Sequence, residues 1–153
     1  MVSLGLLILR VVVGGIFAVH GYTKVFGGAG KSETISPQAE KLLGSGFKQF
    51  MDYGGMENQA GFLQSLGVPY PKAMAGLVMG SEFLGGLLLI LGWHTRLAAL
   101  ALTINQIVAI QKVHLPHGLI NSGPNASGFE FNAVLAAATA TLTVAGPGKI
   151  ALD

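Results

Sequence analysis

The sequence predicts an all-α membrane protein, a four-transmembrane-helix bundle with a long helical connection between the first and second spans. Of the chain, 51% is apolar and only 10% is charged, whereas a soluble domain carries about a quarter charged residues. Four apolar segments, at residues 3–26, 73–93, 97–113 and 129–145, are long enough to span a membrane, the last two only just. None alternates polar and apolar residues as barrel strands do, and a helix satisfies its own backbone hydrogen bonds.

We expect the first span to be retained, because it lacks the basic start and the cleavage pattern of a removable signal peptide. Small residues such as Gly14 and Gly21 in this span, and Gly80 and Gly86 in the second, predict close packing of the helices. Only residues 94–96 separate the second span from the third, which predicts an antiparallel hairpin.

The connection at residues 27–71 is predicted to be ordered. Apolar side chains recur in it at helical spacing, as in a short amphipathic helix on the membrane surface: Leu42, Leu43, Phe47, Phe50 and Met51. A second short helix is predicted at residues 61–66, before the stop signals Gly67 and Pro69. Two interpretations stay open for this connection, a cap on the bundle and a lid over a site.

The second long connection, at residues 115–128, is rich in turn residues and is predicted to be a loop, and the fourth span ends at residues 146–148. With four spans, both termini lie on one side of the membrane and both long connections on the other. The connection side carries six lysines, namely Lys24, Lys31, Lys41, Lys48, Lys72 and Lys112. The other side has Arg96, Lys149 and the terminal amine, so the positive-inside rule would place the long connections in the cytoplasm.

Polar side chains within the spans predict a structural polar core. Its members are Arg10, Glu82, Asn105, Gln106 and Arg96. Counting about 1.5 Å per residue from the span ends places most of them at similar depths, with Glu82 in reach of the Arg10 side chain. A charge at this depth is costly unless it is paired. We therefore expect an Arg10–Glu82 ion pair that fixes the packing; in the alternative, Glu82 carries protons.

A second polar cluster is predicted near the long connections. Its candidate catalytic residues are His20, Lys24, His114 and Glu130, with His117 and Asn132 close by. Converging imidazole, ammonium and carboxylate groups could bind a small anion, or the carbonyl oxygens of a quinone, and pass protons to it. Structural explanations also stay open, since Lys24 could reach the lipid headgroups and Glu130 could complement the N-terminal end of its own helix.

The composition limits the cofactors and partners. Cysteine is absent, which excludes disulfides, thiol relays and Cys-ligated metal or iron–sulfur centres. We predict no metal site, and haem is not expected because the chain lacks H-x-x-x-H spacing. No covalently bound cofactor is expected, which leaves quinone as the candidate. A net charge of only +2 argues against a nucleic-acid partner.

Several segments together resemble the DoxX family of small four-helix membrane proteins: Leu9-Arg10 with Gly14, His20-Gly21 with Lys24, residues 80–96, Phe129-Glu130-Phe131, and residues 146–153. The resemblance implies an integral, multi-pass protein of a bacterial inner or cell membrane with a redox role. Some relatives are subunits of thiosulfate:quinone oxidoreductase, and others accompany enzymes of quinone, thiol or oxidative stress. The connection at residues 27–71 is longer than is usual in the family, so the resemblance does not cover it.

The sequence thus favours a membrane subunit of a quinone-linked oxidoreductase or redox-stress system, which binds a quinone or a small anionic substrate at its long-connection face. Electrons would come from a partner redox subunit or a larger membrane complex. A non-catalytic assembly or anchor subunit is the first alternative. A small-solute carrier is the second, although discontinuous helices and an inverted repeat are not evident. The lipid bilayer is itself a partner, and a homo-oligomer stays open.

Overall fold

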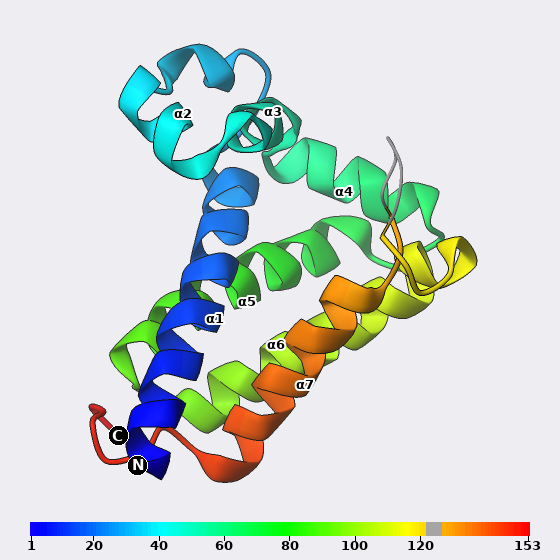
Figure 1. Ribbon diagram of the computed structural model, residues 1–153. Helices are drawn as coiled ribbons and strands as arrows, with labels where there is room; N and C mark the ends of the chain where they lie inside the picture. The colour runs from blue at the N-terminus through cyan, green and yellow to red at the C-terminus, as the bar shows by residue number, and fades with distance from the viewer. Residues whose placement is uncertain (122–126) are drawn as a thin grey trace. The chain divides into compact units, whose positions relative to one another are not determined.

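The computed structural model describes residues 1–121 and 127–153, and every regular element in these ranges is helical, as predicted (Figure 1). The elements are α1 (Val2–Phe26), η1 (Lys31–Thr34), α2 (Pro37–Leu43), α3 (Ser45–Tyr53), α4 (Met56–Ser65), α5 (Pro71–Leu91), α6 (Thr95–Ala109), η2 (Ile110–His114), η3 (Leu115–His117) and α7 (Glu130–Ala145).

Three helical stretches are long and apolar enough to cross a membrane. They are α1 with 25 residues, α5 with 21, and the stretch Thr95–His117 with 23, in which α6 continues through η2 and η3. The third span is therefore longer than predicted, and its last turns change to the wider π and the tighter 3-10 hydrogen-bond patterns. The fourth apolar helix, α7, has only 16 residues.

Contacts divide the chain into two compact units, and both α1 and α5 contribute to each of them. The helix-pair unit comprises residues 1–16 and 84–153, and so includes α6 and α7. The connection unit comprises residues 17–83.

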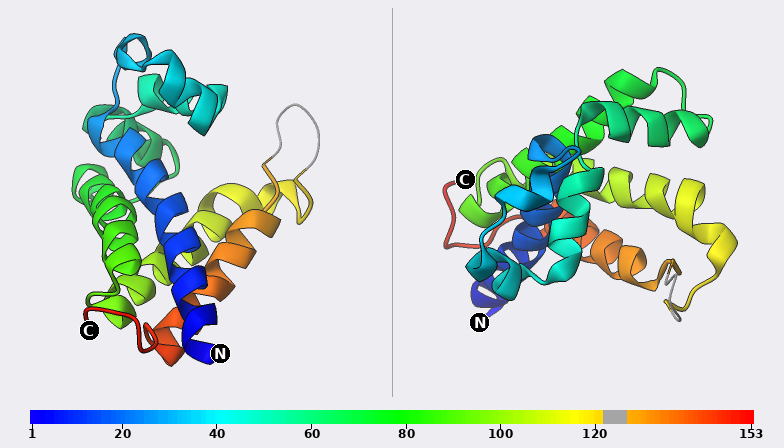
Figure 2. Two further views of the ribbon diagram at one scale, coloured as in Figure 1. Left: turned by 60° about the vertical axis from the view of Figure 1, so that its left-hand side comes forward. Right: turned by 90° about the horizontal axis from the view of Figure 1, so that it is seen from above.

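The helix-pair unit is built around α6 and α7, which run side by side in Figure 1 and in both views of Figure 2. Leu102 of α6 and Leu142 of α7 are fully buried, and the Thr103 and Thr139 hydroxyls are 2.8 Å apart in a hydrogen bond between the two helices. At the crossing of α1 with α5, a Cβ on Gly14 would lie 2.6 Å from the Gly86 carbonyl oxygen, so only glycine allows this approach.

In the connection unit, the single amphipathic helix predicted around Leu42 to Met51 is wrong, because the chain breaks at Gly44. This glycine has φ of +87°, a conformation that L side chains rarely adopt, and it separates α2 from α3. The face of α3 that carries Phe47 and Met51 is buried, as its spacing predicted, whereas Leu42 of α2 is 83% exposed.

The second short helix of the connection is longer than the predicted residues 61–66, since α4 begins at Met56. It ends at Ser65, two residues before Gly67, as the stop signal indicated. Ala60 and Leu63 of α4 pack against Ala75 and Met79 of α5 in a small apolar core.

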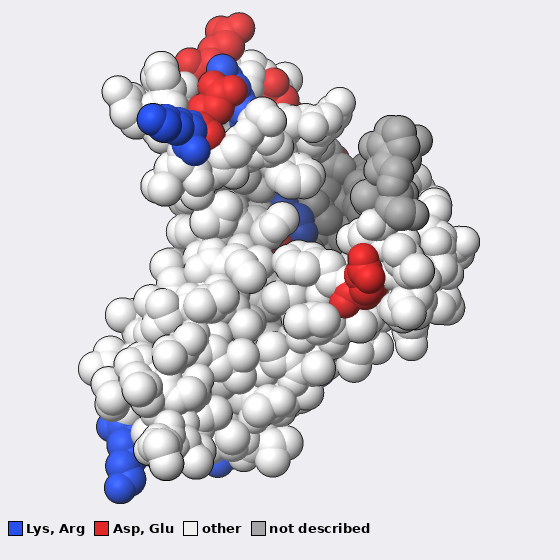
Figure 3. Space-filling view, in the orientation of Figure 1, with Lys and Arg blue, Asp and Glu red and all other residues white. Residues whose placement is uncertain are grey.

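Charged side chains gather on the connection, whereas few lie over the long apolar helices on the face drawn in Figure 3. Residues 27–53 carry three basic and three acidic side chains: Lys31, Lys41, Lys48, Glu33, Glu40 and Asp52. The Asp52 carboxylate accepts a hydrogen bond of 2.8 Å from the Ser32 amide. Hydrogen bonds from Ser32 lower the pKa of this carboxyl group, so the negative charge that ties η1 to α3 is stabilised.

Candidate functional site

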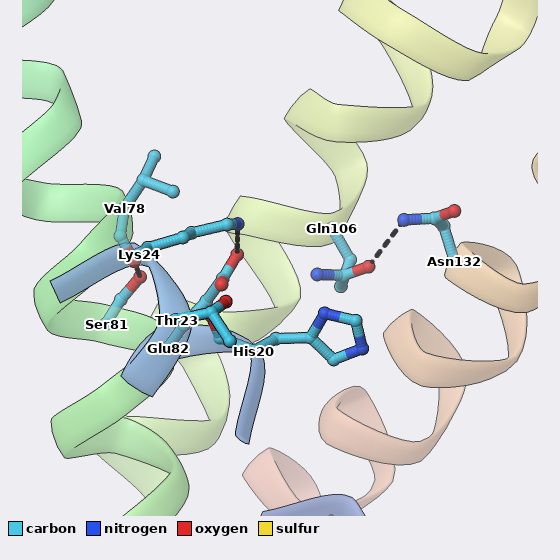
Figure 4. Close-up of polar contacts among 8 residues, drawn as sticks. All are labelled: His20, Thr23, Lys24, Val78, Ser81, Glu82, Gln106 and Asn132. Atoms are coloured by element: carbon cyan, nitrogen blue, oxygen red, sulfur yellow. Dashed lines mark hydrogen bonds and ion pairs between the residues drawn. The ribbon is translucent and has the colours of Figure 1, made fainter. Parts of the chain in front are cut away.

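An ion pair joins Lys24 of α1 to Glu82 of α5 within the connection unit (Figure 4). Lys24 Nζ lies 2.6 Å from Glu82 Oε1. The glutamate side chain is only 6% exposed, whereas the lysine side chain is 28% exposed. The pair therefore combines a buried carboxylate with an ammonium group that still reaches the surface of its unit, in a short, charge-assisted hydrogen bond.

The close approach of α1 and α5 at Gly21 explains why these residues meet. A Cβ on Gly21 would lie 2.6 Å from the Phe83 Cα, so the two backbones touch there. At about 1.5 Å per residue, α1 continues for only about 8 Å beyond Gly21, whereas α5 begins about 18 Å before Phe83. The helix ends are thus not level. Counting from the helix ends therefore wrongly assigned Lys24 and Glu82 to two different polar clusters.

The predicted ion pair between Arg10 and Glu82 is wrong, because Arg10 bonds to carbonyl groups of the helix-pair unit instead. Its Nη1 donates to the carbonyl oxygens of Leu89 at 3.0 Å and Ile90 at 2.8 Å, and its Nη2 donates to that of Ile150. The first two carbonyls belong to the last turn of α5, where a helix lacks internal donors. Arg10 is 2% exposed, so it is buried as expected of a residue within a span, but its partners are not the predicted one.

Arg96 caps a second helix end in the same way. Its Nη1 donates to the carbonyl oxygens of Thr143 at 2.8 Å and Val144 at 2.5 Å, at the end of α7. A positive charge there also complements the negative end of the helix dipole. The residue is exposed, so it lies at the surface and not in the polar interior to which we assigned it.

Sequence reasoning missed the tail segment, residues 148–153, which closes the turn between α5 and α6. The Asp153 carboxylate accepts hydrogen bonds from the amides of His94 at 2.5 Å and Thr95 at 2.9 Å, and so caps the first turn of α6. The Gly92 carbonyl in turn accepts from the Leu152 and Asp153 amides. An acidic residue can cap a helix that is distant in sequence, and only the recurrence of this tail in the resemblance hinted at a role.

The Asp153 cap predicts a loss of stability in acid. Desolvation acts to raise the pKa of the Asp153 carboxyl, but hydrogen bonds from Thr95 and His94 outweigh it and hold the pKa below the ordinary value of 3.8. A lowered folded-state pKa stabilises the fold above the unfolded-state pKa, and this contribution is lost as the pH falls through the folded value. We expect Asp153→Asn to lower the melting temperature at pH 7, and the difference from the wild type to vanish as the pH falls through the lowered pKa of the folded state. A difference that is constant with pH would contradict the prediction.

The candidate residues His114 and Glu130 lie in the helix-pair unit, where both hold the connection between α6 and α7. His114 Nδ1 lies 2.7 Å from the Ser127 carbonyl oxygen, and Glu130 Oε1 accepts from the Asn121 amide at 2.9 Å. Glu130 is exposed and is the first residue of α7. These contacts favour the structural explanation for Glu130, since a carboxylate at this position complements the positive helix end.

Gln106 and Asn132 connect α6 to α7 through a hydrogen bond of 2.9 Å, visible in Figure 4. Gln106 is buried, in agreement with its predicted place in the polar core, and Asn105 beside it is half-buried. His117 is exposed in η3.

His20 lies one turn before Lys24 on α1, so it belongs to the same part of the connection unit as the Lys24–Glu82 pair. Its ring is 5.7 Å from the Phe50 ring, and its carbonyl oxygen accepts from the Thr23 hydroxyl at 2.8 Å. The Lys24 ammonium can donate a hydrogen bond, the Glu82 carboxylate can accept a proton, and the His20 imidazole can relay it. That His114 and Glu130 belong to the same site as His20 and Lys24 stays a prediction.

A helical fold with several apolar helices that can cross a membrane defines a multi-pass integral membrane protein. The chain belongs to the DoxX family, whose model matches residues 5–115. It is 28% identical over 151 residues to "Putative oxidoreductase CatD" of Bacillus subtilis (strain 168), covering 99% of this chain and 86% of that protein. No solved structure matches. The family match includes Lys24 and Glu82, whereas Glu130 lies beyond it.

Proposed function

We propose that this protein is a membrane subunit of a quinone-linked oxidoreductase or redox-stress system and that it binds a quinone or a small anionic substrate beside Lys24. Membership of the DoxX family and the similarity to a protein named as an oxidoreductase support a membrane protein linked to redox chemistry. The observation that carries the finer proposal is the ion pair of the buried Glu82 with the more exposed Lys24.

The chemistry of quinone reduction fits this pair. Reduction to a quinol adds two electrons and two protons, and the negative charge develops on the carbonyl oxygens. The Lys24 ammonium can donate a hydrogen bond to such an oxygen, and the charge-assisted bond strengthens as the oxygen becomes negative. Glu82 and His20 can hold and pass on the protons. The electrons come from a partner redox subunit, and His114 and Glu130 are further candidates for the same site.

Removal of the ammonium group is expected to weaken quinone binding. A hydrogen bond to a charged donor contributes about 1.5–3 kcal/mol, so Lys24→Gln should raise the dissociation constant of decylubiquinone about tenfold or more. The measurement is equilibrium binding of radiolabelled decylubiquinone to protein in mild detergent. Lys72→Gln is the matched control, because Lys72 forms an ion pair of 3.0 Å with Glu57 in which both side chains are more than two-thirds exposed.

Mass spectrometry of gentle extracts distinguishes this proposal from the assembly alternative. A quinone that co-purifies with the protein supports the proposal. Extracts without quinone, together with no binding of decylubiquinone to the purified protein, would contradict the proposal. Co-purifying subunits whose association survives Lys24→Gln and Glu82→Gln would then identify an assembly or anchor subunit.

We also propose that α7 is the fourth membrane span. With 16 residues it is about 24 Å long, which is short for a hydrocarbon core of about 30 Å. Support comes from the helix-pair unit, in which a Cβ on Gly148 would lie 3.2 Å from the Ser3 Cα. Both ends of the chain thus lie close together, which fits an even number of crossings, because such a number places both ends on the same side of the membrane.

Labelling of single cysteines tests the number of spans, because the chain has no cysteine of its own. We expect Val2→Cys and Lys149→Cys to react with a membrane-impermeant maleimide from the same side of sealed vesicles. Lys41→Cys, in the connection, should react from the opposite side. Labelling of positions 2 and 149 from opposite sides would show an odd number of spans.

A further inference from the structure

An apolar cleft of about 400 Å³ lies in the connection unit, on a part of α1 that the proposed quinone site does not use. Its lining comes from α1, the segment after η1, α2, α3 and α5: Ala18, Val19, Tyr22, Ile35, Ala39, Leu43, Phe47 and Phe83. This volume is within the range of small-molecule sites, about 300–1,000 Å³. The cleft is open at the surface of the unit, since Tyr22 and Leu43 are each 40% exposed.

The lining favours a hydrocarbon ligand. Tyr22 is the one lining residue with a polar side chain, so a polar ligand would lose hydrogen bonds to water without replacing them. Three of the side chains form an aromatic wall, in which the Tyr22 ring centre lies 6.3 Å from that of Phe47 and 6.2 Å from that of Phe83. Such a wall offers contact area to a methylene chain.

The elements around the cleft indicate where the hydrocarbon comes from. One wall belongs to α1 and α5, which are apolar enough to cross the membrane. The other belongs to the short helices of the connection, which expose apolar side chains such as Leu42 (83%) and Phe50 (51%), as helices on a membrane surface do. Tyr22 lies near the end of α1, where tyrosines mark the edge of the hydrocarbon layer. The nearest source of hydrocarbon is therefore the bilayer.

The cleft and the Lys24–Glu82 pair are separate sites. At about 100° per residue, Lys24 points about 160° away from Tyr22 around the α1 axis. A ligand in the cleft therefore does not touch the ammonium group, and a result at one site does not decide the other.

We propose that this cleft binds one acyl chain of a membrane phospholipid, which packs against the end of α1 and holds α2 and α3 on it. Residues 27–53 carry three basic and three acidic side chains, so the charges beside the cleft cancel. The cleft therefore selects the hydrocarbon of the lipid and not the charge of its headgroup.

Filling the cleft tests the proposal. Ala39→Phe adds a ring to the α2 wall, and Gln38→Phe adds the same ring at the exposed neighbouring position, which does not line the cleft. Native mass spectrometry of the protein in mild detergent counts the phospholipids that each chain retains. We expect one phospholipid on the wild type and on Gln38→Phe and none on Ala39→Phe. After delipidation, rebinding from phosphatidylglycerol and from phosphatidylcholine vesicles should agree within about twofold, a difference of about 0.4 kcal/mol.

Equal retention by all three proteins, or no retention by the wild type, would overturn the proposal. So would a quinone that is displaced by Ala39→Phe in place of a phospholipid. If Ala39→Phe does not fold, Ala18→Leu narrows the cleft from α1 and should cause the same loss. Strong preference for phosphatidylglycerol would overturn the part of the proposal that concerns the headgroup.

Discussion

Replacement of Arg10 by methionine is expected to lower the free energy of unfolding by about 3 kcal/mol or more. Arg10 is 2% exposed, and its guanidinium group bonds to three backbone carbonyls, those of Leu89, Ile90 and Ile150. Each buried polar group that loses its partner costs about 1–3 kcal/mol. The methionine variant no longer buries a charged group, which offsets part of the stability lost at the three carbonyls. The measurement is thermal unfolding in detergent, followed by circular dichroism.

Arg96→Met is the matched control for Arg10→Met. Arg96 also bonds to the carbonyls at a helix end, but it is exposed, so water can replace the lost donor. We expect a loss of only about 0.5–1 kcal/mol for Arg96→Met. Equal losses of stability for the two variants would contradict the importance of burial.

Arg10→Lys should lose less stability than Arg10→Met. Its ammonium can bond to some of the three carbonyls but, unlike the planar guanidinium group of arginine, cannot reach all of them.

The helices that carry most of the apolar surface could be predicted from sequence because their composition alone decides them. The first and second spans, predicted at residues 3–26 and 73–93, occur as α1 at Val2–Phe26 and α5 at Pro71–Leu91. A continuous apolar run has no other stable state in a membrane than a helix. The third span was predicted too short, because the apolar run ends near residue 113, whereas the helix continues with altered hydrogen bonding to His117.

The connection was harder to predict, since periodicity identifies a buried face but not a break in the helix. Phe47 and Met51 are buried as expected. Gly44 interrupts the same pattern only through its backbone conformation, and a glycine inside a helical pattern does not reveal its φ angle.

The partners of the buried charges could not be predicted, because they depend on how far each helix extends beyond its crossing. The contact at Gly21 offsets α1 from α5 and brings Lys24 to Glu82. The partners of Arg10 are backbone carbonyls, which every residue possesses, so no residue type indicates them. What the sequence does indicate is that a charge within an apolar span has a partner, and both charges have one.

Loss of the Lys24 ammonium is expected to cost about 2 kcal/mol of stability. Removing one partner of a fully buried ion pair costs about 3–5 kcal/mol. We expect less for Lys24, because its side chain is 28% exposed and water screens the pair. In Lys24→Met, the Glu82 carboxylate, which is 6% exposed, loses its charged partner and lies next to an apolar side chain. In the double variant Lys24→Met/Glu82→Gln both charges are gone, and we expect its stability within about 1 kcal/mol of the wild type.

The exposed pair of Lys72 and Glu57 provides the control cycle. Its side chains are 71% and 78% exposed, so the coupling energy between Lys72→Met and Glu57→Gln should be below about 0.5 kcal/mol. Additive effects of Lys24→Met and Glu82→Gln would contradict a buried pair.

The double variant also separates structure from chemistry, because it keeps the fold without the ammonium and the carboxylate. If Lys24 and Glu82 only fix the packing of α1 on α5, the stable double variant should bind decylubiquinone as the wild type does. If they hold the substrate, binding is lost although the melting temperature is kept. Only the second outcome agrees with the proposed function, because a purely structural pair can be replaced by apolar and neutral groups of similar shape without loss.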